Sequence, residues 1–206
     1  MRSSLKYFIA LLLPGWLLAA PAPVSLSDYS AQELVKYLEL QPLADEGGFF
    51  RQIYLSAHTV KNADLRPSPY PAGEHPVGTV IYFLMTPEAF SALHLLATDE
   101  TLIFIAGDPV DTLLLYPDGR VREITIGPDL ARGHHLNFTV PAGVWQGHSI
   151  RKQGRHGYAM FNAFMSPGFT WQDFKAGHES ALSRAYPGAA RRIHELVRPE
   201  LAPGVR

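Results

Sequence analysis

The chain of 206 residues is long enough for one domain with a sizeable hydrophobic core. Its 47% hydrophobic and 18% charged residues are typical of a globular protein and exclude an intrinsically disordered chain. The net charge is −1 and the sequence shows no basic patch, so nucleic acid is not an expected partner. The absence of cysteine excludes disulfides, thiolate nucleophiles and cysteine-bound metal centres.

Residues 1–25 have the pattern of a signal peptide. Arg2 and Lys6 precede an apolar run that is short for a membrane span and is interrupted by Pro14-Gly15. Ala20-Pro-Ala22 is the best candidate for the cleavage site. We therefore expect a secreted or periplasmic protein with no membrane association after cleavage. A membrane anchor formed by an uncleaved segment is the alternative.

A single domain is expected over residues 28–206, with a barrel core over about residues 45–170. At its start, Ser30 and Glu33 form a capping box before an apolar stripe. This pattern predicts a short helix over residues 31–39, packed on the outside of the barrel.

The next feature is the segment Glu46-Gly-Gly, which allows a tight turn into a strand that contains Arg51. Arg51 has apolar neighbours on its own face of the strand, so it is expected either to reach a ligand or to brace a carboxylate such as Glu46 or Glu100. The polar, proline-rich stretch 62–76 shows no periodicity and predicts a long loop, which could be a lid or a dimer arm.

Short apolar runs bounded by turn residues recur along the rest of the chain, at a spacing typical of a β-sandwich or β-barrel. These runs cover residues 79–85, 91–96, 101–105, 111–116, 121–126, 135–140, 144–150 and 158–165. Two helical stretches follow, at about residues 180–185 and 189–197, and they could pack on the outer sheet or on a partner subunit.

Two of these runs, Ser91–Leu96 and Thr101–Ile105, are joined by the turn-forming pair Thr98-Asp99 and predict a β-hairpin. In such a hairpin, His94 lies diagonally from Glu100 on the same face. An imidazole and a carboxylate are costly to bury in an apolar barrel without a partner, so they indicate a site for water, an ion or a ligand. A structural hydrogen bond between them is the alternative.

The spacing His94-x-Leu96-x-x-x-Glu100 resembles the first cupin motif, with Leu96 in place of a histidine. The second cupin motif is similar to Pro141–Gln146, where Gln146 stands in place of another histidine. Six segments recur in the same order in the DUF985 (cupin 5) family: Glu46–Arg51, Thr98–Glu100, Gly107–Pro109, Pro117–Gly119, Pro141–Gln146 and Pro167–Phe169. The resemblance implies an all-β double-stranded β-helix, or jelly roll, with a short N-terminal helix and C-terminal helices. It also implies a predicted sugar epimerase, as members of this family are often labelled.

A small barrel of this kind can enclose a ligand cavity. The expected lining combines a few polar groups with aromatic side chains: His94, Glu100, Gln146, Arg51, Tyr82, Phe104, Trp145 and Tyr158. The expected partner is a small polar, sugar-like molecule.

Three functions compete for this site. In a metal-free epimerase or isomerase, His94 is the general base, Glu100 orients it, and Tyr82 or Tyr158 supplies the acid; no cofactor is needed. In a binding protein, the same pocket holds its ligand without chemistry. In a metal-dependent cupin, His94, Glu100 and Gln146 are the candidate ligands of a divalent metal.

A homodimer is the last expectation. Ile103 and Ile105 are apolar where a solvated strand should alternate to polar residues, and the resemblance points the same way, since cupins commonly pair. The alternative is that the N-terminal segment and the C-terminal helices cover this surface.

Overall fold

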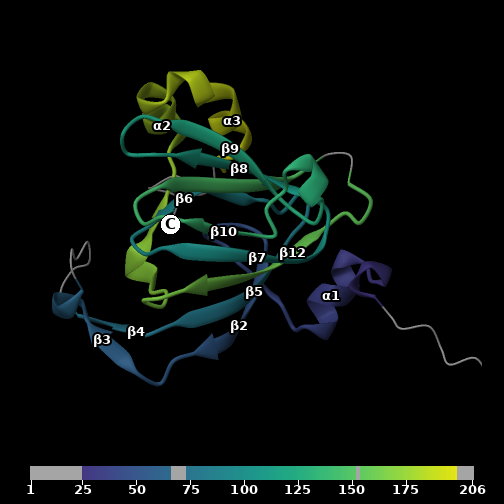
Figure 1. The fold of residues 1–206 in the computed structure, drawn as a ribbon, viewed down its shortest axis with the longest axis horizontal. Coiled ribbons are helices and arrows are strands. Elements are labelled where there is room, and N and C mark those ends of the chain that lie inside the picture. Colours follow the sequence, from purple (N-terminus) through teal and green to yellow (C-terminus); the bar gives the residue numbers. More distant parts are fainter. Residues whose placement is uncertain (1–24, 66–72, 152–153, 199–206) are drawn as a thin grey trace, which may run out of the picture.

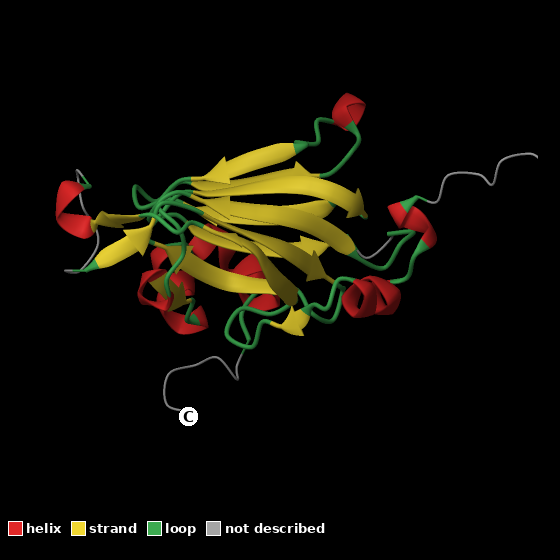
Figure 2. Cartoon of the chain, turned by 90° about the horizontal axis from the view of Figure 1, so that it is seen from below, coloured by secondary structure: helices red, strands yellow, loops and turns green. Residues whose placement is uncertain are grey.

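The computed structural model describes residues 25–65, 73–151 and 154–198. These residues form two antiparallel β-sheets that pack face to face, with short helices around them (Figures 1 and 2). Apart from Ser25, the expected signal peptide lies outside the described residues. In the part of the chain that the structure describes, no helix has the length and apolar character needed to cross a membrane.

The first sheet has six strands in the order β1-β2-β5-β12-β7-β10. Its strands are β1 (Gln41–Pro42), β2 (Phe49–Leu55), β5 (Thr79–Met85), β12 (Ala159–Met165), β7 (Glu100–Gly107) and β10 (Asn137–Val140). The second sheet has five strands in the order β13-β6-β11-β8-β9. They are β13 (Phe174–Ala176), β6 (Ser91–Leu96), β11 (Trp145–Ile150), β8 (Val110–Leu115) and β9 (Val121–Ile126). Successive strands from β5 to β8 and from β9 to β13 alternate between the two sheets, which confirms the predicted jelly roll.

A separate two-stranded sheet pairs β3 (Thr59–Lys61) with β4 (Glu74–Pro76). The expectation of a loop throughout the stretch 62–76 is wrong at its end, because Glu74–Pro76 finds backbone partners on β3. Residues 66–72 lie outside the described residues. In Figure 1 this hairpin extends from one end of the sandwich.

The predicted hairpin between β6 and β7 is also wrong. The neighbours of β6 are β11 and β13, whereas the neighbours of β7 are β10 and β12. The three residues after Leu96 therefore carry the chain from one sheet to the other instead of turning it back along the same sheet. His94 and Glu100 face each other across the sandwich, on opposite sheets.

The main core lies between the sheets and is made of inward side chains from both of them. Phe83, Leu102 and Phe161 come from the six-stranded sheet, and Leu114 and Ile124 come from the five-stranded sheet; all five are buried.

Helices cover both outer faces. The helix α1 (Ala31–Tyr37) begins at the predicted Ser30–Glu33 capping box and buries Leu34 against Leu84 and Met160 of the six-stranded sheet. The helices α2 (Glu179–Ala185) and α3 (Ala190–Glu195) lie on the five-stranded sheet, where Ile193 packs against Leu113 (Figure 1). Short 3-10 helices join these elements: η1 (Leu26–Asp28), η2 (Asn62–Asp64), η3 (Leu130–Arg132), η4 (Trp171–Asp173) and η5 (Pro187–Ala189).

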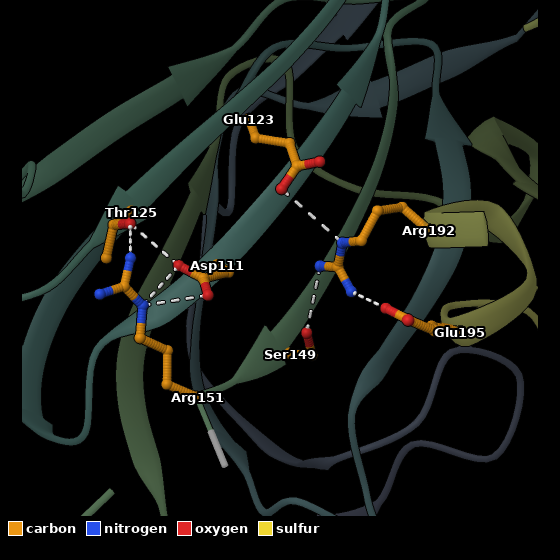
Figure 3. A network of polar contacts seen from close by, with 7 residues as sticks. All are labelled: Asp111, Glu123, Thr125, Ser149, Arg151, Arg192 and Glu195. Atoms are coloured by element: carbon orange, nitrogen blue, oxygen red, sulfur yellow. Dashed lines mark hydrogen bonds and ion pairs between the residues drawn. The ribbon is translucent and has the colours of Figure 1, made fainter. Parts of the chain in front are cut away.

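A polar network reinforces the contact between α3 and its sheet (Figure 3). Arg192 reaches Glu123 on β9 at 3.7 Å and Ser149 on β11 at 3.4 Å, while Glu195 holds its guanidinium at 2.6 Å. Its side chain is only 18% exposed, so its aliphatic part also packs. The helix is therefore fixed in one position over the sheet.

Candidate functional site

A cavity of about 280 Å³ opens between the two sheets. Its polar lining side chains are Glu46, Gln52, Thr79 and Glu100. Four aromatic side chains, Phe50, Phe169, Trp171 and Phe174, form much of its wall, and the remaining lining residues are aliphatic or methionine. An apolar wall with a few convergent polar groups is the usual composition of a small-molecule pocket.

Glu46 is held in the cavity by the turn that precedes β2. The amide of Gly47 donates to the carbonyl of Leu43 at 2.6 Å, and Gly47 has a φ of +109°, which L side chains rarely adopt. A Cβ on Gly47 would collide with the carbonyl oxygen of Phe90, so only glycine fits this close approach. The turn places the Glu46 carboxylate beside β6, where the Ser91 hydroxyl donates to it at 2.6 Å.

Glu100 begins β7 and enters the cavity from the six-stranded sheet. A chain of hydrogen bonds reaches it from the five-stranded sheet: Gln146 Nε2 donates to Glu100 Oε2 at 2.7 Å, and His148 Nε2 donates to Gln146 Oε1 at 3.2 Å. The other ring nitrogen, Nδ1, lies 2.9 Å from the Thr112 hydroxyl. This arrangement fixes His148 as a neutral Nε2–H tautomer and directs a donor at the Glu100 carboxylate.

His94 lies directly behind the lining, 1% exposed, with its ring stacked on Phe174 at 5.5 Å. Its Nδ1–H donates to the carbonyl of Ala92 at 2.8 Å, so Nε2 carries the lone pair. Within the described residues Nε2 has no hydrogen-bond partner, and the nearest acidic oxygen is Glu46 Oε2 at 3.9 Å. The predicted proximity of His94 and Glu100 is present, but across the sandwich and with Glu46 as a third member.

The environment brings the pKa of both carboxyls close to neutrality. Burial raises the pKa of Glu46 to about 7, against the donation from Ser91. Burial also raises the pKa of Glu100 to about 7, the charge of Glu46 adds to the rise, and His94 and Gln146 oppose it. The opposite happens to the imidazoles, since burial lowers the pKa of His94 and lowers that of His148 to about 3. Near pH 7 the site therefore holds two neutral imidazoles and two carboxyls that can each bind or release a proton.

Three of the predicted site residues lie on the outer face of the six-stranded sheet, so the expectation that they line the cavity is wrong. Arg51 pairs with Tyr82 across β2 and β5, forms an ion pair with Glu39 at 3.3 Å, and does not brace Glu46 or Glu100. Tyr82 packs in the cluster under α1. Tyr158 is fully buried in the same cluster, and its hydroxyl donates to the carbonyl of Leu26 at 2.7 Å.

Two further residues also lie elsewhere. Trp145 packs against the C-terminal helices, because Gln146 and His148 face inward on β11 and Trp145 takes the opposite face. Phe104 faces inward but fills the core, where its ring meets Phe161 edge to face at 5.6 Å.

The sequence patterns miss several residues of the site. They indicate Glu46 only as a motif residue or as a partner for Arg51, and they do not indicate the wall formed by Phe169, Trp171 and Phe174. The signal for this wall is the aromatic cluster that follows Pro167-Gly. Its segment is held by Asp173, whose carboxylate lies 3.0 Å from His75 Nε2 and accepts from the Thr170 amide at 2.9 Å.

The side chains do not fit the metal centre that the cupin motifs would imply. Leu96 offers no donor atom, and the amide oxygen of Gln146 already accepts from His148 while its amino group points at Glu100. Among the described residues, no group of three or more His, Asp or Glu side chains could hold a metal ion. Gln146 and Glu100 are therefore joined to each other by a hydrogen bond, with His94 beside them, and the three side chains are not arranged as a ligand set.

The fold and the cavity define a jelly roll of the cupin type with potential for binding a small molecule. Residues 32–177 match the family described as the cupin superfamily (DUF985), and the chain belongs to this family.

Solved structures of two relatives have the same fold. A hypothetical protein from Leishmania major is 31% identical with a TM-score of 0.74, over 82% of this chain and 99% of that one. A protein from Shewanella oneidensis is also 31% identical, with a TM-score of 0.71 over 84% of this chain and 99% of that one. An uncharacterized protein of Saccharomyces cerevisiae is 24% identical over 135 residues, which span 62% of this chain and 66% of the yeast protein.

Proposed function

We propose that the protein binds a small polar, sugar-like molecule in the cavity and catalyses a metal-independent proton transfer of the isomerase type. One observation carries this proposal: two electrostatically coupled carboxyls, Glu46 and Glu100, line the same apolar cavity, each with a pKa of about 7. A general acid or base is most effective when its pKa is near the working pH.

The pair can supply a base and an acid together. Because the two carboxyls interact with each other, the first proton is released more easily than the second, and near pH 7 the pair holds one proton in its main state. The ionised carboxylate takes a proton from a carbon next to a carbonyl group. The protonated carboxyl gives its proton to the carbonyl oxygen, which forms an enediol. Reversal at the neighbouring carbon completes an isomerisation and restores the pair.

The positions of the polar groups favour isomerisation over epimerisation. Inversion at a carbon requires a second acid or base on its opposite side. The tyrosines expected to provide it, Tyr82 and Tyr158, lie outside the cavity. The other polar lining groups in the described part of the chain, Gln52, Thr79 and the Trp171 indole, do not titrate near neutral pH.

His94 has a positioning role in this proposal. It lies behind the lining, and its interaction with Glu100 opposes the rise in the pKa of that carboxyl. The chain from Thr112 through His148 and Gln146 ends in a donor at the Glu100 carboxylate and holds it in one rotamer. The charge of Glu46 acts in the opposite direction and raises the pKa of Glu100. Either carboxyl of the pair can therefore be the base while the other is the acid, and His94 and the hydrogen-bond chain hold Glu100 in place.

Deuterium exchange tests the proposal on many candidate substrates at once. The protein is incubated in D₂O with a panel of small aldoses, ketoses and hydroxycarbonyl compounds, and carbon-bound deuterium is followed by NMR. We expect exchange in at least one compound that binds, loss of exchange in Glu100→Gln and a reduced rate in Glu46→Gln. The exposed Glu88→Gln variant is the charge-matched control. If compounds bind but none exchanges, the catalytic proposal is wrong and the protein is a binding protein.

A further inference from the structure

We infer that the cavity selects a ligand with a positive charge, an organic ammonium group placed beside Glu46 and Glu100 with its carbon body against the aromatic wall. This inference rests on the cavity of the proposed function and adds the charge class of its ligand. An amino sugar, or a cyclic amine of similar size, has the required chemistry.

The acidic end of the cavity is rich in acceptors. The Glu46 and Glu100 carboxylates line it. Directly behind this lining, His94 Nε2 lies 3.9 Å from Glu46 Oε2 and has no hydrogen-bond partner in the described residues. Among the side chains that the structure describes, Ser91 and Gln146 alone donate to the two carboxylates. An ammonium group brings three N–H donors and a positive charge, so it complements this end better than a hydroxyl does.

The aromatic wall favours the same ligand. Phe169, Trp171 and Phe174 follow one another with neighbouring rings nearly perpendicular: the centroids of Phe169 and Trp171 are 5.1 Å apart, and those of Trp171 and Phe174 are 5.9 Å apart. Perpendicular rings present both faces and edges to one space, and an aromatic face attracts a cation. Trp171 is 54% exposed while it lines the cavity, so a bound ligand can cover its ring.

Charge balance excludes the opposite class of ligand. None of the described residues that line the cavity is basic, whereas two are acidic. A phosphate or carboxylate group would meet like charges in an apolar pocket with no counter-charge, and burial of an unpaired charge is costly. Nucleoside-diphosphate sugars are therefore poor candidates. A cation instead lowers the pKa of the carboxyls and leaves them ionised, the form that accepts a proton.

Three ligands built on the same cyclohexane ring but of different charge test the inference: cyclohexylamine, cyclohexanol and cyclohexanecarboxylate. The amine stays protonated across the accessible pH range, since alkylammonium groups titrate near pH ~10. Binding is measured by calorimetry and by the fluorescence of Trp171. We expect the amine to bind at least about tenfold more tightly than the alcohol, from its ion pair and its contact with the rings, and the carboxylate to bind most weakly.

Variants assign the selectivity to named residues. Glu46→Gln and Glu100→Gln should each weaken amine binding about tenfold while alcohol binding changes little, and Glu88→Gln should match wild type. In wild type, amine affinity should rise between about pH 6 and about pH 8 as the carboxyls ionise. The groups that face this pair are His94 and, through Gln146, His148, and burial keeps both imidazoles neutral over that range.

The inference is wrong if the alcohol or the carboxylate binds as tightly as the amine, if the amine does not bind at millimolar concentration, or if Glu46→Gln keeps full amine affinity. These outcomes are separate from those of the exchange experiment. Glu100-dependent exchange in a neutral sugar without amine selectivity would refute the charge class and leave the proposed function standing. Amine selectivity without deuterium exchange would refute the proposed catalysis and leave the charge class of the ligand standing.

Discussion

Replacing Glu46 with glutamine is expected to stabilise the protein above neutral pH and to change little in acid. In the folded state the pKa of Glu46 is raised from 4.5 to about 7, so the folded protein binds this proton more tightly than the unfolded chain does. Such a group contributes stability that is fully present below the unfolded pKa and is lost as the pH rises through the folded pKa. Glutamine keeps an acceptor for the Ser91 hydroxyl but carries no charge, so the variant avoids the loss.

The rise in pKa sets the magnitude. One pKa unit corresponds to about 1.4 kcal/mol, which gives an upper limit of about 3 kcal/mol for the gain above pH 7. Part of the Glu46 side chain, 17%, remains exposed, and its charge is shared with Glu100, so we expect about 1–2 kcal/mol, or roughly 2 to 8 °C in Tm.

Urea and thermal unfolding at about pH 4 and about pH 8 measure this effect, because the wild-type and variant curves should coincide in acid and separate above neutrality. Glu88→Gln, an exposed substitution of the same charge, should show no such separation. A Glu46→Gln variant that is less stable than wild type at both pH values would refute the argument, and so would a difference that does not change with pH.

Three further predictions concern other parts of the molecule. His94→Ala should lower the free energy of unfolding in urea by about 2–3 kcal/mol, because the stacking on Phe174 and the hydrogen bond to Ala92 are lost. The same variant should shift the pH dependence of deuterium exchange to higher pH, and an unchanged pH dependence would rule out its positioning role. Light scattering should give the mass of a dimer, because Ile103 and Phe164 remain 40% and 38% exposed on one face of the six-stranded sheet. Phe164→Glu should give the mass of a monomer, and a monomeric wild type would contradict the prediction. The protein recovered from periplasm or medium should lack residues 1–22 or a similar segment, and an intact N-terminal sequence would favour the anchor.

Local sequence signals predict the elements but not their partners. The capping box at Ser30, the strand positions and the C-terminal helices follow from turn residues and apolar periodicity within a few residues, and the structure has them. The partners of β6 depend on contacts far along the chain, and a connection of three residues after Leu96 is compatible both with a hairpin and with a crossing between sheets. Of the two outward isoleucines, Ile105 packs in the cluster under α1, whereas Ile103 stays exposed.

The candidate site is likewise predicted only in part by local sequence patterns. Alternation correctly groups Arg51 apart from Gln52, and Trp145 apart from Gln146, but it does not tell which of the two groups faces the cavity. The apolar neighbours of Arg51 in the sequence suggest that it is buried and needs an acidic partner in the cavity. In the structure it forms its ion pair with Glu39 on the outer face of the sheet. Glu46 enters the site because its turn joins β6, where the Ala92 amide donates to its carbonyl at 2.9 Å, and no local pattern contains that contact.

Exchange of carbon-bound hydrogen in D₂O by wild type and by Glu100→Gln decides whether the carboxyl pair transfers protons. We expect wild type to introduce deuterium at the carbon next to a carbonyl in a compound that it binds. With Glu100→Gln we expect none above background, although the variant still folds and binds that compound. Equal exchange by the two proteins, or binding without any exchange in wild type, would contradict a proton-transfer site built on the carboxyl pair.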